Sequence, residues 1–301
     1  MTELELQHLR REKWRIDGEP IRTLEEARDF IDSVGMSLTY PLRQAIPLPT
    51  LIGATLGNDQ SLPTRQNAFK DPRAKRVEEL LPNLVRNKFT FEAQLHGETL
   101  LLAPPIFPYY YALASDRKPK QPMRSRVRGQ ASPLTEHVFS ELDANGPLSR
   151  RQLQEQLGGS LSESALDRAL QELSAALKIT RVDHDPKTGD TWDVYYRWAP
   201  DAVNEGVRIS DAEAMSALIS KYLDCTVAAT QEEIETFFSV FTSRARIAEV
   251  VKALLAAREF SYTPSESRTL ITVSHKNISS ESPRATRERD SATMLPRRRN
   301  G

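Results

Sequence analysis

The sequence is poor in cysteine and histidine, with one Cys and five His among its 301 residues. Cys225 cannot form a disulfide bond within the chain, and no group of Cys and His has the spacing of zinc ligands. No run approaches the roughly 18 apolar residues of a membrane span, and the first residues lack the apolar core of a signal peptide. We therefore expect a cytoplasmic protein without a metal, a cofactor or a membrane partner.

An excess of one charge is absent as well, because Lys plus Arg and Asp plus Glu each number 41. Binding to nucleic acid would therefore have to depend on local charge. Common enzyme motifs are also missing, among them GxSxG, HExxH, a phosphate-binding loop and a Gly-rich dinucleotide motif. Acids and bases occur at five positions whose spacing does not predict that they converge, and we assign them no reaction: Glu92, His96, Asp183, His184 and Asp185.

Two segments have too little apolar surface to offset the entropy of ordering. Residues 116–131 hold six basic residues and one acidic residue, and the C-terminal tail is rich in Ser, Arg and Pro. The expected organisation is a flexible N-terminus (1–19), an N-terminal domain (20–115), a basic linker (116–131), a winged helix (132–200), a second winged helix (208–275) and a disordered basic tail (276–301).

The part after the linker contains the same plan twice. The first copy begins with a helix that has one apolar face. Two further helices follow, and their starts are marked by capping-box spacing at Ser149 and Gln152 and at Ser160 and Glu163. The β-rich runs "KITRVDHD" and "TWDVYYRW" then surround the turn sequence "PKTG". Three helices followed by a hairpin are typical of a winged helix.

The second copy repeats the capping spacing at Ser210 and Glu213 and at Thr230 and Glu233, and it closes with the hairpin-like "EFSYTPSESRTLITV". The predicted fold class is therefore mainly α with small β-hairpins (α+β), with tandem winged helix-turn-helix domains. In the N-terminal domain, Thr23 begins a helix that Gly35 ends, and a hairpin is expected to turn at His96 and Gly97. A third, degenerate winged helix and a distinct cap are the alternatives there.

Several segments together are similar to a known family. They are "EEARDFIDSVG", "YPLRQAIPLPTLIGATLG", "FPYYYALA", "GPLSRRQLQEQLG" and "SDAEAMSALISKYLDCTVAATQEEIETFF". They resemble the winged-helix proteins related to AlkZ, the bacterial crosslink-repair DNA glycosylases. The resemblance implies tandem winged helices arranged to hold duplex DNA, and a catalytic Gln-x-Gln or Gln-x-Asp pair in the N-terminal region. Gln44 lies near that place, but it is followed by Ala45 and Ile46, so a second polar residue is not evident.

The two candidate recognition helices differ in charge. Residues 162–178 carry three acidic and two basic residues, which favours packing or contact with a protein partner over insertion into a DNA groove. Residues 243–258 carry four basic residues against one acidic residue, and Arg244 and Arg246 stand in the first turn, which usually meets base edges. The candidate DNA-binding residues are Arg244, Arg246, Lys252, Arg268, Lys187, Arg124, Arg126 and Arg128.

The aromatic group Phe107, Tyr109, Tyr110 and Tyr111 could stack on a base, but its setting among prolines favours a packed core. The leading hypothesis is a double-stranded DNA-binding protein of tandem winged helices, acting in repair or regulation. One alternative is a DNA glycosylase that removes alkylated or crosslinked bases with the help of Gln44. The other is a protein-interaction module that uses the acidic helix 162–178.

Overall fold

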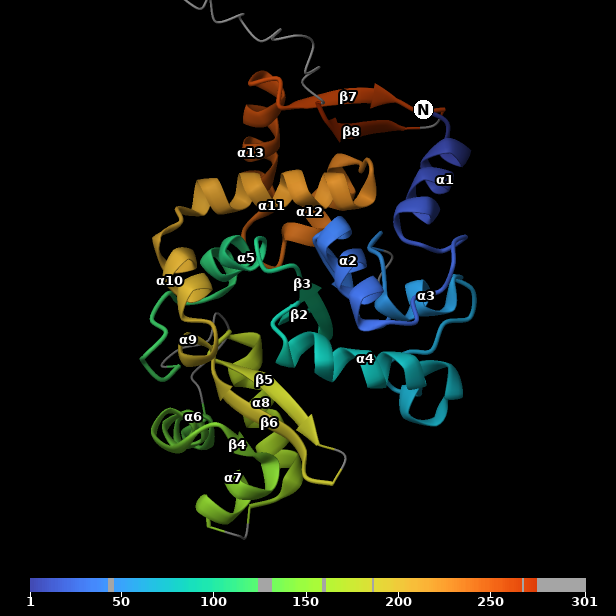
Figure 1. Cartoon of the computed structure of the whole chain (residues 1–301). Coiled ribbons are helices and arrows are strands. Elements are labelled where there is room, and N and C mark those ends of the chain that lie inside the picture. The colour runs from blue at the N-terminus through green and yellow to red at the C-terminus, as the bar shows by residue number, and fades with distance from the viewer. Residues whose placement is uncertain (43–45, 124–131, 159–160, 186, 267, 275–301) are drawn as a thin grey trace, which may run out of the picture.

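The computed structural model describes residues 1–42, 46–123, 132–158, 161–185, 187–266 and 268–274. Its helices outnumber its strands, and the strands form antiparallel sheets of two or three strands each. The predicted fold class, mainly α with small β-hairpins, is therefore confirmed. Figure 1 shows the chain arranged as three units, with the middle unit at one end and the C-terminal unit at the other.

The N-terminal unit begins with a helix whose limits the sequence predicts. Thr23 and Glu26 form the expected capping box, and Gly35 ends the helix in the left-handed conformation, at φ 74°. The β-hairpin turns at His96 and Gly97, as predicted. The elements are α2 (Leu24–Val34), β1 (Met36–Leu38), α3 (Leu51–Leu56), η1 (Ala68–Lys70), η2 (Pro72–Ala74), α4 (Lys75–Arg86), β2 (Phe91–Leu95) and β3 (Glu98–Leu102). The sheet has the order β1-β3-β2.

The middle unit has the same order of α-helices and strands, without counterparts of η1 and η2 among the described residues. They are α6 (Pro133–Asn145), β4 (Leu148–Ser149), α7 (Arg150–Gln156), α8 (Glu163–Ala175), β5 (Ile179–Asp185) and β6 (Gly189–Val194). The sheet order is β4-β6-β5. Ser149 and Gln152 form the predicted capping box. The cap of α8 is corrected from Ser160, which lies outside the described residues, to Ser162, whose hydroxyl accepts a hydrogen bond from the Ala165 amide.

The last β-rich run also requires a correction. The sequence predicts extended chain through Trp198, but β6 ends at Val194 and α9 (Tyr195–Trp198) follows. A strand would send Tyr195 and Trp198 to opposite faces, whereas a helical turn places residues three apart on one side. Both rings pack in that way into one aromatic group, with centroids 5.9 Å apart.

The C-terminal unit repeats the plan with one strand reduced to a bridge. After α10 (Pro200–Arg208), its elements are α11 (Asp211–Thr226), α12 (Gln231–Phe238), α13 (Arg244–Ala256), β7 (Phe260–Pro264) and β8 (Thr269–Val273). Ala229 pairs with Ile271 of β8 where the other units have their first strand. Ser210 caps α11 by accepting from the Glu213 amide, and Thr230 and Glu233 form a full capping box on α12. The predicted starts of both helices are confirmed.

An apolar core runs through the N-terminal and C-terminal units, and α5 (Phe107–Ala114) lies within it. Phe107, Tyr110 and Tyr111 are each at most 3% exposed, which confirms the prediction of a packed aromatic segment. The Phe107 ring lies 5.0 Å from the Tyr195 ring, which comes from the end of the middle unit. The rest of the middle unit has a separate apolar core of its own.

The first residues form a docked helix, which corrects the expectation of a flexible segment at 1–19. Helix α1 (Glu3–Lys13) buries Leu6 against Ala228 and Leu270. The Arg10 guanidinium donates to the carbonyls of Thr226 and Ala228. These contacts lie more than 200 residues away along the chain, so local sequence patterns could not show them. Figure 1 places α1 beside the β7–β8 hairpin.

The first part of the basic linker is also held in place. The Lys178 ammonium group donates to Asp116 at 2.8 Å and to the Lys118 carbonyl at 2.7 Å. The predictions for residues 124–131 and for the tail 276–301 fall outside the described residues. Within the described part of the chain, no helix is long and apolar enough to cross a membrane, and no cluster of three or more His, Cys, Asp or Glu could hold a metal ion.

We expect Leu6→Ala to lower the free energy of unfolding by about 2 kcal/mol or more, because it opens a space beneath α1. Leu4 on the same helix is 79% exposed, so Leu4→Ala is the matched control and should change it by less than about 0.5 kcal/mol. Urea unfolding of both variants measures the difference. Equal stabilities would show that α1 is not docked in solution.

Candidate nucleic-acid interface

Helix α8, the candidate recognition helix of the middle unit, faces another part of the same chain. It contacts β2 of the N-terminal unit. Asp167, Leu170 and Gln171 of α8 line a cavity between the two units. The N-terminal unit of the same chain therefore lies next to the face of α8 that would have to enter a DNA groove.

The charge of α8 is distributed differently from the sequence pattern. The Glu172 side chain is only 7% exposed and accepts a hydrogen bond from the Thr135 hydroxyl, and Lys178 is 2% exposed. Burial lowers the pKa of Lys178, against the opposing effect of its bond to Asp116. The exposed acids are Glu163 and Asp167, and Arg150 of α7 forms ion pairs with both. The acidic surface is thus smaller and more nearly neutral than expected.

Helix α13 presents its basic residues to solvent. Ser243 caps it by accepting from the Arg246 amide, so Arg244 and Arg246 stand in the first turn as predicted. Arg246 is 58% exposed and forms a surface ion pair with Glu249 at 2.9 Å. Arg244 and Lys252 are exposed, and the described residues provide no ion-pair partner for either. Both can therefore meet an external anion without first breaking an internal bond.

Arg246 is also brought near the start of the basic linker. It lines a depression of about 320 Å³ together with Arg117 and Asp211. The Arg117 guanidinium donates to the Ala112 carbonyl and pairs with Asp211. The linker residues Arg124, Arg126 and Arg128, which follow along the chain, lie outside the described residues.

The other candidate contacts lie elsewhere. Lys187 is exposed in the turn between β5 and β6. Figure 1 shows the β5–β6 hairpin at the end of the molecule opposite α13. Arg268 is 32% exposed, and its guanidinium donates to both carboxylate oxygens of Glu3 and pairs with Glu233 at 3.5 Å. Arg268, which directly precedes β8, therefore joins the β7–β8 hairpin to α1 and α12, a role that the sequence pattern does not indicate.

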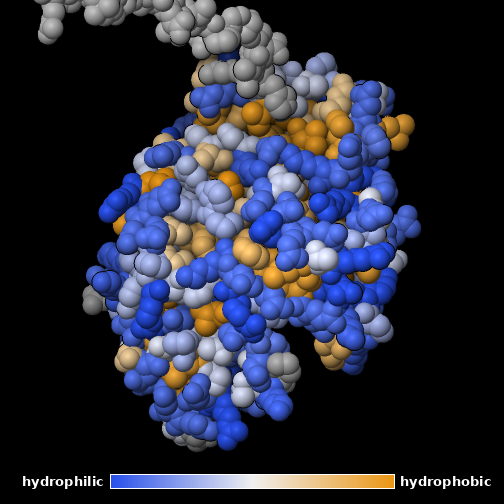
Figure 2. All heavy atoms as spheres, viewed as in Figure 1, coloured by the Kyte–Doolittle hydropathy of each residue, from blue (hydrophilic) through white to orange (hydrophobic). Residues whose placement is uncertain are grey.

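The cavity next to α8 measures about 620 Å³ and lies between the N-terminal unit and the middle unit. Its walls come from α4, β2, β3, α8, β5 and β6. Figure 2 shows the surface hollowed on this side, between the β5–β6 hairpin and the region of α4. Tyr40 and Glu78 are among its polar lining residues, and burial, with Glu78 nearby, raises the pKa of Tyr40 to about 12.

One wall of this cavity is a charged network that joins the two units. Arg181 of β5 pairs with Glu92 of β2, and the two side chains are 17% and 12% exposed. Asp190 lies 3.4 Å from Arg181 and 2.8 Å from the His184 imidazole. Burial lowers the pKa of Arg181, but the two carboxylates outweigh burial and leave that pKa above its usual value. Arg181 is therefore charged, and Glu92 is held as its counter-ion.

In the sequence, the spacing of Glu92 predicts no partner for it, and no pattern points to Arg181. The register of the β5–β6 pairing shifts between Arg181 and Asp183. This irregularity breaks the alternation of faces that a strand pattern assumes. The partner also comes from another unit, 89 residues away, so no local signal could have found the pair.

The candidate catalytic residue Gln44 lies outside the described residues. Ile46, which stands where a Gln-x-Gln pair would have its second polar residue, is 9% exposed and belongs to the apolar core. On the short helix α7, Gln152 accepts a hydrogen bond from the Ser149 amide as part of the helix cap. That glutamine has a structural role.

Comparison with known protein families gives a match to the family model described as DNA glycosylase AlkZ-like, over residues 70–297. The match covers the middle and C-terminal units and reaches into the N-terminal unit at Lys70. It does not include Gln44. None of the curated proteins compared with the chain matches it. The resemblance found in the sequence is confirmed at the level of the family.

We expect Glu92→Gln to destabilise the protein by about 3 kcal/mol, because it leaves the largely buried Arg181 without its main counter-ion. Glu155→Gln is the control, because Glu155 and its ion-pair partner Arg151 are 61% and 80% exposed, respectively. Its expected effect on the free energy of unfolding is below about 1 kcal/mol. Chemical unfolding followed by tryptophan fluorescence compares the two. An effect of Glu92→Gln no larger than that of the control contradicts the assignment of this pair as the joint between the units.

Proposed function

The chain belongs to the AlkZ-like DNA glycosylase family, and on this premise we propose that it binds double-stranded DNA in DNA repair through tandem winged helices. The proposed winged helices correspond to residues 20–115, 132–200 and 208–275. The observation that carries the proposal is the solvent-exposed basic face of α13, where Arg244 and Lys252 have no ion-pair partner among the described residues.

The common order of elements supports the winged-helix assignment. Each unit has a helix, a first strand or bridge, two helices and a hairpin. The two three-stranded sheets share one strand order, in which the last strand lies between the other two. In this scheme α4, α8 and α13 are the third helices of their units, the position that enters the major groove in helix-turn-helix proteins.

The three third helices would then have different roles. Helix α8 faces the N-terminal unit, so it supports the cavity rather than reading DNA. Helix α13 would contact phosphates or base edges through Arg244, Arg246 and Lys252, and Lys187 would contact the backbone from the hairpin of the middle unit. Arg268 is not part of this proposed surface, because its guanidinium is engaged by Glu3 and Glu233.

The family match also favours a second function, the release of an alkylated or crosslinked base. Such chemistry requires a base to leave the stack and enter a site on the protein. The cavity between the N-terminal and middle units measures about 620 Å³, so it has room for a base. Its lining includes acidic side chains such as Glu78 and Glu98. Gln44 remains the proposed catalytic residue, with a carboxylate as its partner.

Replacing Arg244 and Arg246 together by Ala should weaken duplex binding and reduce the slope of log K against log salt by about 2, because two phosphate contacts are lost. Arg151 and Arg168 are 80% and 78% exposed on α7 and α8, so their double Ala variant is a control of equal charge. Fluorescence anisotropy over a salt series measures both. A wild-type protein without salt-dependent binding, or one that copurifies with a stoichiometric protein partner instead, would contradict the proposal.

For the second function, we expect the wild-type protein to release bases from an alkylated duplex and Gln44→Ala to reduce single-turnover release by about 100-fold or more, the scale of a lost acid–base or charge-stabilising group. Gln231→Ala, at an exposed glutamine on α12, is the control. Chromatography of released bases gives the rate. Tight binding without release by the wild type would rule out the glycosylase assignment.

A further inference from the structure

An exposed aromatic ring stands in a strongly basic segment that leads into the first residues of α4. Residues 65–76 contain five basic residues and one acidic residue, in a chain whose formal net charge is zero. In the middle of this segment Phe69 is 71% exposed, and the Lys70 ammonium group lies 5.1 Å from the centre of its ring. Apolar side chains of this size are usually buried, so the exposure of Phe69 needs an explanation.

The segment is held firmly enough to present that ring. The Thr64 amide donates to the Asn67 side chain at 2.7 Å, and Asp71 caps η2 by accepting from the Arg73 amide. Ala68 and Ala74, on either side of the ring, are 6% and 0% exposed and belong to the apolar core. Phe69 is thus turned outward between two anchored points.

The other cations of the segment are also exposed to solvent. Lys75 is 78% exposed, and its distance to Glu79 is 4.0 Å. Arg73 pairs with Asp71 and Arg76 pairs with Glu79, and both arginine side chains are about half exposed. An exposed ring beside Lys70, in a segment with further exposed cations, matches the chemistry of a nucleic acid, because a base can stack on the ring and phosphates can pair with the cations.

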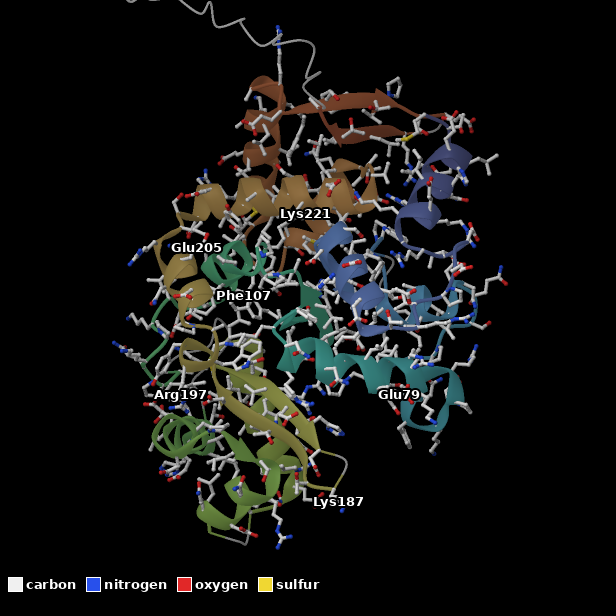
Figure 3. All side chains as sticks on the ribbon, viewed as in Figure 1. Glu79, Phe107, Lys187, Arg197, Glu205 and Lys221 are labelled. Atoms are coloured by element: carbon white, nitrogen blue, oxygen red, sulfur yellow. The ribbon has the colours of Figure 1, made fainter. Side chains whose placement is uncertain are left out.

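The location connects this surface to the cavity. Arg65, the first residue of the segment, lines the cavity and donates to the Gly97 carbonyl at 2.6 Å. Figure 3 shows Glu79 of α4 and Lys187 of the β5–β6 hairpin on the two sides of the hollow. A duplex that spans these two sides would lie across the mouth of the cavity, which Arg65 of the same segment lines.

We propose that residues 65–76 form a second DNA-contact surface in which Phe69 stacks on a base exposed by a local break in the duplex stack, while Lys70 and Lys75 contact the adjacent phosphates. The proposal rests on the proposed binding of duplex DNA and deepens it, because it assigns the protein a preference for DNA with an unstacked step. It involves no covalent chemistry, and it is independent of the contacts of α13.

The experiment compares an intact duplex with the same duplex containing one abasic site, which exposes the faces of the neighbouring bases. The wild type should bind the abasic duplex more tightly. Phe69→Ala and Phe69→Leu should each lower the affinity for that duplex roughly 10-fold, which is within the range for one base–aromatic stack. Both should change the affinity for the intact duplex little. Phe69→Trp should keep the preference, because it retains an aromatic face.

Two controls separate stacking from charge and from folding. Leu4→Ala removes another exposed apolar side chain and should leave both affinities unchanged. Lys70→Ala combined with Lys75→Ala should weaken binding to both duplexes equally and reduce the slope of log K against log salt by about 2. Circular dichroism of each variant checks its fold, and none of the substituted side chains is buried.

The outcomes distinguish this inference from the function on which it rests. If the wild type binds the intact duplex with salt dependence but Phe69→Ala binds the abasic duplex as tightly as the wild type does, the stacking surface is wrong and the proposed function stands. A Phe69→Leu variant that retains full preference would also overturn stacking. If the wild type binds neither duplex, both proposals fail together.

Discussion

The attachment of the middle unit to the N-terminal unit depends on a group of aromatic rings around Phe107. The ring of Phe107 packs edge-on against Phe91 of β2 at 4.6 Å and stacks on Tyr195 at 5.0 Å, while Trp198 closes the group at 5.2 Å from Phe91. These residues come from the N-terminal unit, from α5 and from the segment that leaves the middle unit. Rings of this size bury a large apolar area and prefer specific edge and stacked geometries, so they fix both the position and the angle of the elements they join.

The two joints in the molecule differ in chemistry. The N-terminal and C-terminal units share one apolar core, whereas the middle unit keeps a core of its own. Its attachment therefore relies on the aromatic group and on polar bonds, namely Arg181 with Glu92, Lys178 with Asp116, and Arg86 with Asp183. Charged bonds of this kind specify one alignment of two surfaces, and the cavity that Arg181 and Glu92 border owes its shape to that alignment.

Local patterns in the sequence were sufficient for elements whose ends carry their own signals. Thr23, Ser149 and Thr230 cap their helices through side chains only three residues away, and the His96–Gly97 turn is equally local. Where a side chain has a distant partner, the same patterns gave the wrong environment. Lys178 was counted as a surface charge although it is buried against Asp116, and residues 1–19 were expected to be flexible although α1 docks on the C-terminal unit. The proposed DNA contacts depend on which arginines remain exposed, and that follows only from the packing of the whole chain.

The docking of α1 also constrains the order in which the protein is assembled. Arg10 and Trp14 donate to the carbonyls of Thr226, Ala228 and Cys225 at the end of α11, where a helix leaves backbone oxygens without internal partners. Synthesis produces Arg10 216 residues before Thr226. Helix α1 therefore cannot dock until α11 and the residues that follow it as far as Ala228 have been synthesised.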